Sequence, residues 1–131
     1  MAEFLNTTIT QGPPKRYPFS LITKANGFAF VSGQGPVDLE TGKVVEGDIK
    51  AQTKLTLENI CKVLEAEGLT MNHIVKTTVY ITNINDFDAM SEAYVAHFPD
   101  HLPSRTTVGV ATLWGGIKVE IEVMAVLNLN T

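Results

Sequence analysis

The apolar residues of this chain follow helical spacing in only two segments, and its other apolar segments follow strand patterns. The first helix is predicted to begin after Asp48, a capping residue, and to end at Gly68. The second is predicted to start with Asn85 as its cap and to run to about His97, before Pro99. Two helices can cover only one face of a sheet, so their number limits the possible architectures.

The remaining apolar runs predict strands joined by turn sequences. Asn26-Gly27 is a strong hairpin signal because both residues tolerate positive φ. The segment 73–82 alternates as a strand does, and one of its sides is formed by Val75, Thr77, Val79 and Ile81. Strands are expected near the N-terminus and at 19–24, 28–32, 73–82, 104–111 and 118–127. The order predicts an α+β fold with a single mixed sheet and two helices on one face.

The sheet face without helices is predicted to be apolar. The runs "FAFV" at 28–31 and "VMAVL" at 123–127 carry apolar residues on both sides of their strands. In a monomer this pattern would expose a sizeable apolar patch, and self-association is the simplest way to bury it. Neither composition nor periodicity fixes the number of subunits.

Composition limits the class of protein and its partners. The chain has 131 residues, 44% of them hydrophobic and 18% charged, which predicts one folded domain over residues 1–131. Its net charge of −4 offers no basic field for nucleic acid or anionic membranes, so neither is an expected partner. Cys61 is the only cysteine, and no leader or long apolar stretch appears. A cytoplasmic protein is the expectation.

Charged residues in the last two strands suggest a binding site. Arg105 and Thr107 share a face, and the small residues beside them leave room for a guanidinium to bind a carboxylate or phosphate. Glu120 and Glu122 share a face of the final strand, where they are solvated, paired or directed into a cleft. From the motif alone, a cross-strand ion pair or a solvated rim is the more common arrangement.

Several motifs, taken together, resemble one family. "PSRTTV" at 103–108 and "VEIE" at 119–122 are similar to the closing signature of the reactive intermediate deaminase family, also called RidA or YjgF-like. "VSGQGPVDLETGKVV" at 31–45 resembles its SGQ segment, and "KTTVYITNINDFDAMSEAYVAHF" at 76–98 resembles its strand and following helix. The resemblance covers residues 18 to 126 in the family's order and without large gaps.

The resemblance implies a chorismate-mutase-like fold and a homotrimer whose sheets form a central barrel with ligand clefts at subunit interfaces. It also implies hydrolysis of enamine or imine acids to 2-oxo acids and ammonia, without a metal or organic cofactor. The partner would be a small imino acid, enamino acid or 2-oxo acid. Arg105 would then hold the substrate carboxylate, and Glu120 would activate water. Ser32 and the backbones of Gly33 and Thr107 would line the cleft.

The chain departs from the family pattern at three candidate substrate-binding positions. Phe19 stands where the family has a tyrosine, which removes a hydroxyl but keeps an aromatic wall, and Tyr17 lies two residues away. Ser91 replaces an asparagine, and Thr107 replaces a frequent cysteine. These changes bear on substrate range and rate more than on the fold.

Other residues have a simpler interpretation as structural groups. His97 and His101 are four apart, but Pro99 separates them, so solvent-facing loop histidines are expected and no metal site is predicted. Cys61 is expected to be a packed helix residue. Trp114 either covers the cleft mouth or anchors the last hairpin, and the anchor is the favoured interpretation.

Three functions therefore follow from the sequence. The leading hypothesis is an enamine or imine deaminase. The alternative is a non-catalytic trimer that binds a small anion or metabolite, which the phenylalanine at position 19 favours. A ribonuclease is disfavoured by the net charge and by the lack of a basic and aromatic patch.

Overall fold

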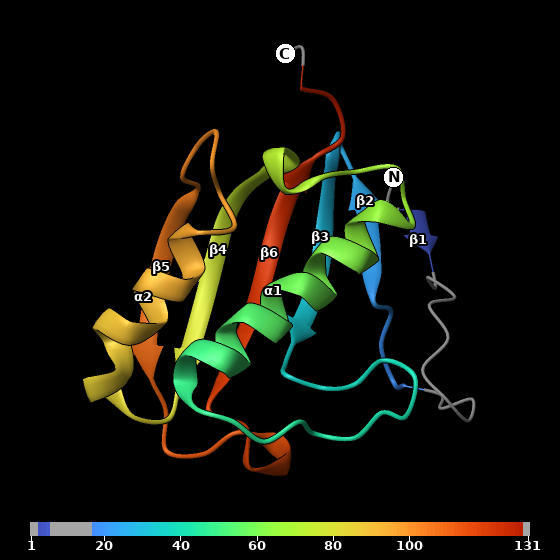
Figure 1. The fold of residues 1–131 in the computed structure, drawn as a ribbon. Helices are drawn as coiled ribbons and strands as arrows, with labels where there is room; N and C mark the ends of the chain where they lie inside the picture. Colours follow the sequence, from blue (N-terminus) through green and yellow to red (C-terminus); the bar gives the residue numbers. More distant parts are fainter. Residues whose placement is uncertain (1–2, 6–16, 130–131) are drawn as a thin grey trace.

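The computed structural model describes residues 3–5 and 17–129 and contains one mixed sheet with two helices on one face (Figure 1). The strand order is β1-β2-β3-β6-β4-β5, in which only β4 and β5 pair in parallel. The strands are β1 (Glu3–Leu5), β2 (Ile22–Ala25), β3 (Phe28–Gln34), β4 (Ile74–Ile81), β5 (Ser104–Gly109) and β6 (Val119–Val126). The helices are α1 (Ile49–Glu65) and α2 (Phe87–Val95), with 3-10 turns η1 (Met71–His73), η2 (Ile84–Asp86) and η3 (Trp114–Gly116). The predicted α+β architecture is confirmed.

The predicted hairpin between β2 and β3 is present. Asn26 and Gly27 have φ values of 51° and 84°, so both turn residues adopt the left-handed conformation that Asn-Gly favours. Ile22 pairs with Val31, which fixes the register of the two strands. On its other side β3 pairs with β6, where Gln34 lies opposite Ile121.

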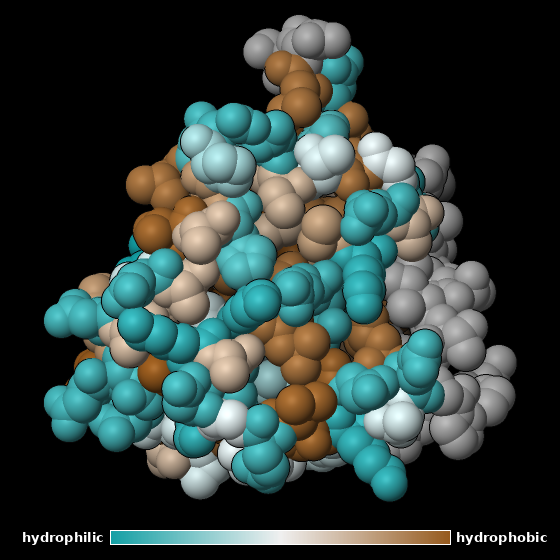
Figure 2. Space-filling view, in the orientation of Figure 1, coloured by the Kyte–Doolittle hydropathy of each residue, from teal (hydrophilic) through white to brown (hydrophobic). Residues whose placement is uncertain are grey.

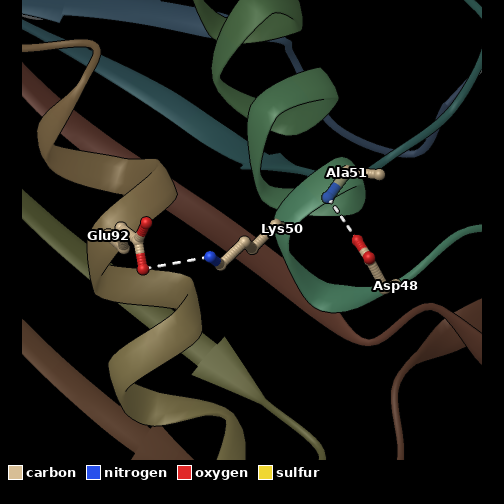
Figure 3. Close-up of polar contacts among 4 residues, drawn as sticks. All are labelled: Asp48, Lys50, Ala51 and Glu92. Carbon is tan, nitrogen blue, oxygen red and sulfur yellow. Dashed lines mark hydrogen bonds and ion pairs between the residues drawn. The ribbon is translucent and has the colours of Figure 1, made fainter.

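Helix α1 begins as the sequence predicts. The Asp48 carboxylate accepts a hydrogen bond from the backbone N–H of Ala51 at 2.8 Å (Figure 3). The Lys50 ammonium lies 3.0 Å from the Glu92 carboxylate and so joins α1 to α2 in the same view. The left-handed Gly68, with φ of 74°, follows the end of the helix.

The predicted start of the second helix is wrong. Asp86 is the N-cap of α2 and makes no side-chain capping hydrogen bond, whereas Asn83 caps the preceding turn η2, where its side-chain oxygen accepts a hydrogen bond from the Asn85 N–H at 3.0 Å. A capping residue needs an extended backbone, which Asn83 has, whereas Asn85 lies inside the turn η2. Helix α2 follows this turn and ends at Val95.

One residue of β4 lies on the face opposite to the predicted one. A register irregularity between Ile74 and Lys76 in the pairing with β6 resets the alternation at the start of the strand. Ile74 is therefore fully buried, and Val75 is exposed instead of lying with Thr77 in the core. From Thr77 onward the predicted alternation is confirmed.

The core lies between the sheet and the two helices. Alternate residues of β6, including Val119 and Ile121, are buried against the apolar side of α1, where Leu57, Ile60 and Leu64 are fully buried. The outer surface of the helix layer carries many hydrophilic residues (Figure 2). This contrast confirms that the helices separate one face of the sheet from solvent.

The opposite face of the sheet carries exposed apolar side chains. Phe28 and Phe30 have 37% and 38% of their surface exposed, and they pair across the strands with Val126 and Met124. We call these four residues the open-face patch. The predicted apolar face without helices is therefore present.

No helix within residues 3–5 and 17–129 is both long and apolar enough to cross a membrane.

Candidate functional site

The carboxylate of Glu120 lies in a pocket of about 680 Å³, which we call the Glu120 pocket. Its lining comes from the segment before β2, the end of β3, the turn η3 and strand β6. The predicted site residues Phe19, Ser32, Gly33 and Glu120 all line this pocket. Four of the residues chosen from the sequence are therefore brought together.

Gly33 and Glu120 lie in unusually close contact. A Cβ atom at position 33 would lie 2.9 Å from the Cδ atom of Glu120, which is closer than such atoms pack. The missing side chain at Gly33 therefore leaves the space that the carboxylate occupies. Here the glycine has a steric role, in addition to the expected lining of the cleft by its backbone.

The environment of Glu120 favours its protonated form. Burial raises the pKa of the Glu120 carboxyl, and the charge of Glu122 raises that pKa further. Glu122 also accepts a hydrogen bond from the Tyr80 hydroxyl at 3.3 Å. The pKa of Tyr80 is raised in turn, first by burial and then by the charge of Glu122. Glu120 is thus the partly buried member of a small acidic group.

The hydroxyl of Ser32 connects β3 to the segment that carries Phe19. It donates to the Ser20 carbonyl at 2.7 Å, and the Ser32 N–H donates to the Leu21 carbonyl at 2.9 Å. The buried Gln34 side chain donates to the Ser32 carbonyl at 3.1 Å. Ser32 therefore holds the aromatic wall in place while it lines the pocket.

Arg105 lies in a separate group of residues beside α2. Its guanidinium donates to Ser91 Oγ at 2.8 Å, and its central carbon lies 5.2 Å from the Phe87 ring centre and 4.8 Å from the Tyr94 ring centre. No carboxylate pairs with Arg105 in the described part of the chain. We call Arg105, Ser91 and these two rings the Arg105 cluster. The guanidinium of Arg105 is therefore held in one orientation, and it keeps N–H donors that can bind an anion.

Two threonines near the Arg105 cluster differ in their partners. Thr77 shares a buried hydrogen bond of 2.7 Å with the hydroxyl of Tyr94. Burial raises the pKa of Tyr94, although the Thr77 hydrogen bond and the charge of Arg105 act in the opposite direction. The buried Thr107 hydroxyl has no hydrogen-bond partner among the described residues.

Arg105 and Glu120 lie on opposite faces of the sheet. Arg105 pairs with Thr77 of β4, whereas Glu120 pairs with Tyr80 of the same strand. Residues three apart in a strand point to opposite sides, and Thr77 faces α2. A cross-strand ion pair between Arg105 and Glu120 within one chain, the simpler alternative from the sequence, is therefore excluded.

Trp114 is a pocket residue that the favoured sequence interpretation placed wrongly. Its side chain is 67% exposed and lines the Glu120 pocket, so it does not anchor the hairpin against the body. Tyr17 also lines the pocket and stacks on Phe19 with 5.2 Å between ring centres. The two glycines that follow Trp114 were the sequence signal for a turn at this residue, and they did not indicate the direction of its side chain.

The two histidines considered as metal ligands contact backbone carbonyls. A ring nitrogen of His97 lies 3.2 Å from the Ala93 carbonyl, and one of His101 lies 2.7 Å from the Ile74 carbonyl. Both side chains are half-buried, so the expectation of solvent-facing loop histidines is wrong. The described residues contain no group of three or more His, Cys, Asp or Glu suited to a metal ion.

Comparison with known proteins places this geometry in a family. A family model described as Endoribonuclease L-PSP matches residues 10–127. A 2-iminobutanoate/2-iminopropanoate deaminase of Salmonella typhimurium is 40% identical over 124 residues, which are 92% of this chain and 96% of that protein. The chain belongs to the RidA/YjgF-like family.

Other members of the RidA/YjgF-like family agree in sequence and in structure. A RutC family protein of Pyrococcus horikoshii is 44% identical over 117 residues, covering 88% of this chain and 93% of that protein. The structure of a Rid family protein of unknown function from Yersinia pestis matches with a TM-score of 0.86 and 39% identity. That match covers 96% of this chain and 99% of the other. The RidA/YjgF-like fold expected from the motifs is therefore confirmed.

Proposed function

We propose that this protein is a hydrolytic deaminase of reactive 2-enamine and 2-imine acids, which it converts to 2-oxo acids and ammonia. The observation that carries the proposal is the half-buried Glu120 carboxylate, which lies against Gly33 in a pocket and has a raised pKa. A carboxyl group whose pKa lies above its ordinary value is suited to proton transfer near neutral pH. The name of the Salmonella relative supports the same chemistry.

The reaction is a hydrolysis and uses only water as co-reactant. Protonation of the enamine at carbon gives the iminium ion, the same species that the imine forms when its nitrogen is protonated. Water adds to the imine carbon while Glu120 accepts one of its protons. Glu120 returns its proton to the nitrogen of the resulting carbinolamine, the carbon–nitrogen bond breaks to release ammonia, and the hydroxyl proton leaves as the carbon–oxygen double bond forms. The carboxylate of Glu120 is regenerated, so each turnover balances.

Arg105 would bind the carboxylate of the substrate. Its planar guanidinium is oriented by Ser91 and two aromatic rings, and its unpaired charge suits a small anion. Because Arg105 and Glu120 lie on opposite faces of one sheet, we propose that the Arg105 cluster of one subunit meets the Glu120 pocket of another. A homotrimer closed through the open-face patch would provide such interfaces.

A non-catalytic metabolite-binding role is the second candidate, and one observation favours it. Phe19 offers no hydroxyl to water or substrate, although Tyr17 stacks on its ring and lines the same pocket. Ribonuclease activity has no comparable support. The described residues that line the pocket include no His, Lys or Arg, and the net charge of the chain is −4.

The test is release of 2-oxobutanoate from 2-aminocrotonate that a threonine dehydratase generates in the assay. Wild type should accelerate release over the uncatalysed rate. Arg105→Ala should lower kcat/KM by about 10²-fold because the substrate loses its orientation. Glu120→Gln should lower it by about 10²- to 10⁴-fold because the general base is lost. Lys62→Ala, an exposed change on α1, is the surface-charge control and should act as wild type.

The outcomes separate the two candidates. Acceleration by wild type that is lost in both site variants supports the deaminase. If folded wild type does not accelerate release but binds 2-oxobutanoate in an Arg105-dependent manner, the metabolite-binding role replaces it.

A further inference from the structure

Three aromatic side chains form one wall of the Glu120 pocket. Phe19 and Trp114 leave 50% and 67% of their surfaces exposed, and Tyr17 stacks on Phe19. Large aromatic surfaces contribute substantial free energy when a ligand covers them. The proposed hydrolysis needs a carboxylate clamp and a base, and therefore leaves this wall without a role.

The chain conformation holds Trp114 at the pocket through the two glycines that follow it. Gly115 and Gly116 have φ values of 69° and 73°, which residues with a side chain rarely adopt. A Cβ at Gly115 would also lie 3.1 Å from Cγ2 of Val44, so the turn packs closely on the loop before α1. The sequence Trp-Gly-Gly therefore forms a tight turn that places the indole of Trp114 against the pocket.

The rest of the wall is apolar too. Leu21, Val37 and Ile117 line the same pocket, whereas Ser32 and Gln34 already donate their side-chain hydrogen bonds to backbone carbonyls. The two glutamates are the charged groups among the described lining residues. A ligand group that enters beside the aromatic rings therefore meets mainly carbon.

Within one chain, the pocket is larger than the smallest substrates need. A volume of about 680 Å³ lies in the range of pockets that hold drug-sized ligands, far larger than an imine with a one- or two-carbon side chain. We propose that Phe19 and Trp114 form a side-chain subsite that selects 2-imino acids with bulky apolar or aromatic side chains. This inference rests on the proposed function, because it assigns the side chain of the same substrate.

Kinetics on a series of imines test the subsite. An L-amino acid oxidase generates the imines of alanine, leucine, phenylalanine and lysine in the assay, and formation of the 2-oxo acid is followed. Wild type should have a kcat/KM about tenfold or more higher for the phenylalanine imine than for the alanine imine. Trp114→Ala should lower this ratio about tenfold, because the phenylalanine imine loses more transition-state binding than the alanine imine does. Trp114→Phe, which keeps an aromatic ring, should retain most of the preference.

A binding measurement gives an independent readout. Trp114 is the only tryptophan of the chain, so its fluorescence reports directly on the subsite. Titration with 4-methyl-2-oxopentanoate should change this fluorescence at lower concentrations than titration with pyruvate.

The unfavourable outcomes are distinct. Acceleration without a size preference, or an equal loss for all imines in Trp114→Ala, would overturn the subsite and leave the deaminase intact. A preference for the lysine imine would also overturn it, because the carboxylates rather than the rings would then select the side chain. No acceleration of any imine would overturn the proposed function and this inference with it.

Discussion

At the scale of single residues, the candidate site has a tight contact between Gly33 and Glu120. The carboxylate occupies the space that a side chain at position 33 would need. The backbone at Gly33 does not have the positive φ that would itself require glycine. Substitution there consequently tests the position of the carboxylate rather than backbone strain.

Gly33→Ala should displace the Glu120 carboxylate and lower kcat/KM by about 10²-fold, since small displacements of a catalytic group carry costs of this size. The free energy of unfolding should change by less than about 1 kcal/mol, because the end of a flexible side chain can move aside. Urea unfolding and imine kinetics measure the two effects. Gly47→Ala is the control, since its Cβ would lie 3.2 Å from Ala51 Cβ and 4.0 Å from Gln52 Cγ, and would not meet Glu120. Full activity in Gly33→Ala would contradict the proposed role of Glu120.

The charge of Glu122 provides a second prediction at this scale. That charge raises the pKa of Glu120, so Glu122→Gln should lower the pKa of Glu120. The basic form of Glu120 then persists to lower pH, and the acidic limb of the kcat/KM profile should move to lower pH. Tyr80→Phe removes the hydrogen bond to Glu122 but keeps the charge, so it should not produce this downward shift. An unmoved limb in Glu122→Gln would show that another group limits the rate.

At the scale of elements, the first turn of α1 fixes both the helix and its contact with α2. The Asp48 carboxylate accepts a helix N–H that would otherwise lack a partner, whereas Lys50 and Glu92 form an exposed ion pair (Figure 3). Capping bonds contribute more to stability than exposed ion pairs do. The two contacts therefore differ in their expected contributions although they lie side by side.

Asp48→Ala should lower the free energy of unfolding by about 1 kcal/mol, the usual contribution of a capping side chain. Lys50→Ala should lower it by less than about 0.5 kcal/mol, because solvent screens the exposed pair. Urea unfolding of both variants measures the difference. Equal effects would mean that the cap contributes no more than a surface charge.

The elements also show which features a sequence can predict. Asp48, Asn26 and Gly27 act through neighbours only a few residues away, and their roles were predicted correctly. The irregularity that exposes Val75 depends on pairing with β6, a distant strand, and local alternation does not contain that information. The cap at Asn83 was missed because two asparagines two residues apart offer the same local chemistry.

In the candidate site too, the sequence predicted some features and not others. The types of residue in the pocket were predicted because motifs mark Ser32, Gly33 and Glu120. The placement of Arg105 and Glu120 on opposite faces follows from the register in which β5 and β6 pair with β4, which the sequence alone did not provide. The direction of Trp114 depends on two left-handed glycines and on contact with a loop far away in sequence.

At the scale of the whole molecule, two incomplete sites and an apolar face have one common explanation. The Arg105 cluster has a cation without a described carboxylate partner, and the Glu120 pocket has bases without a described cation. The open-face patch exposes Phe28 and Phe30 on the sheet face opposite the helices. Assembly of identical subunits would bury the patch and could bring a cluster and a pocket together at each interface.

Complementation between two inactive variants tests this arrangement. Arg105→Ala and Glu120→Gln chains, each with a different affinity tag, are co-expressed, and assemblies that carry both tags are purified. In a trimer with cyclic symmetry, about one site in three then combines an intact Arg105 with an intact Glu120 from its neighbour, so about a third of wild-type activity should return. Each variant purified alone should stay inactive. If the mixed assemblies are also inactive, the two residues do not meet across an interface, because one site of each mixed trimer would otherwise have recovered both groups.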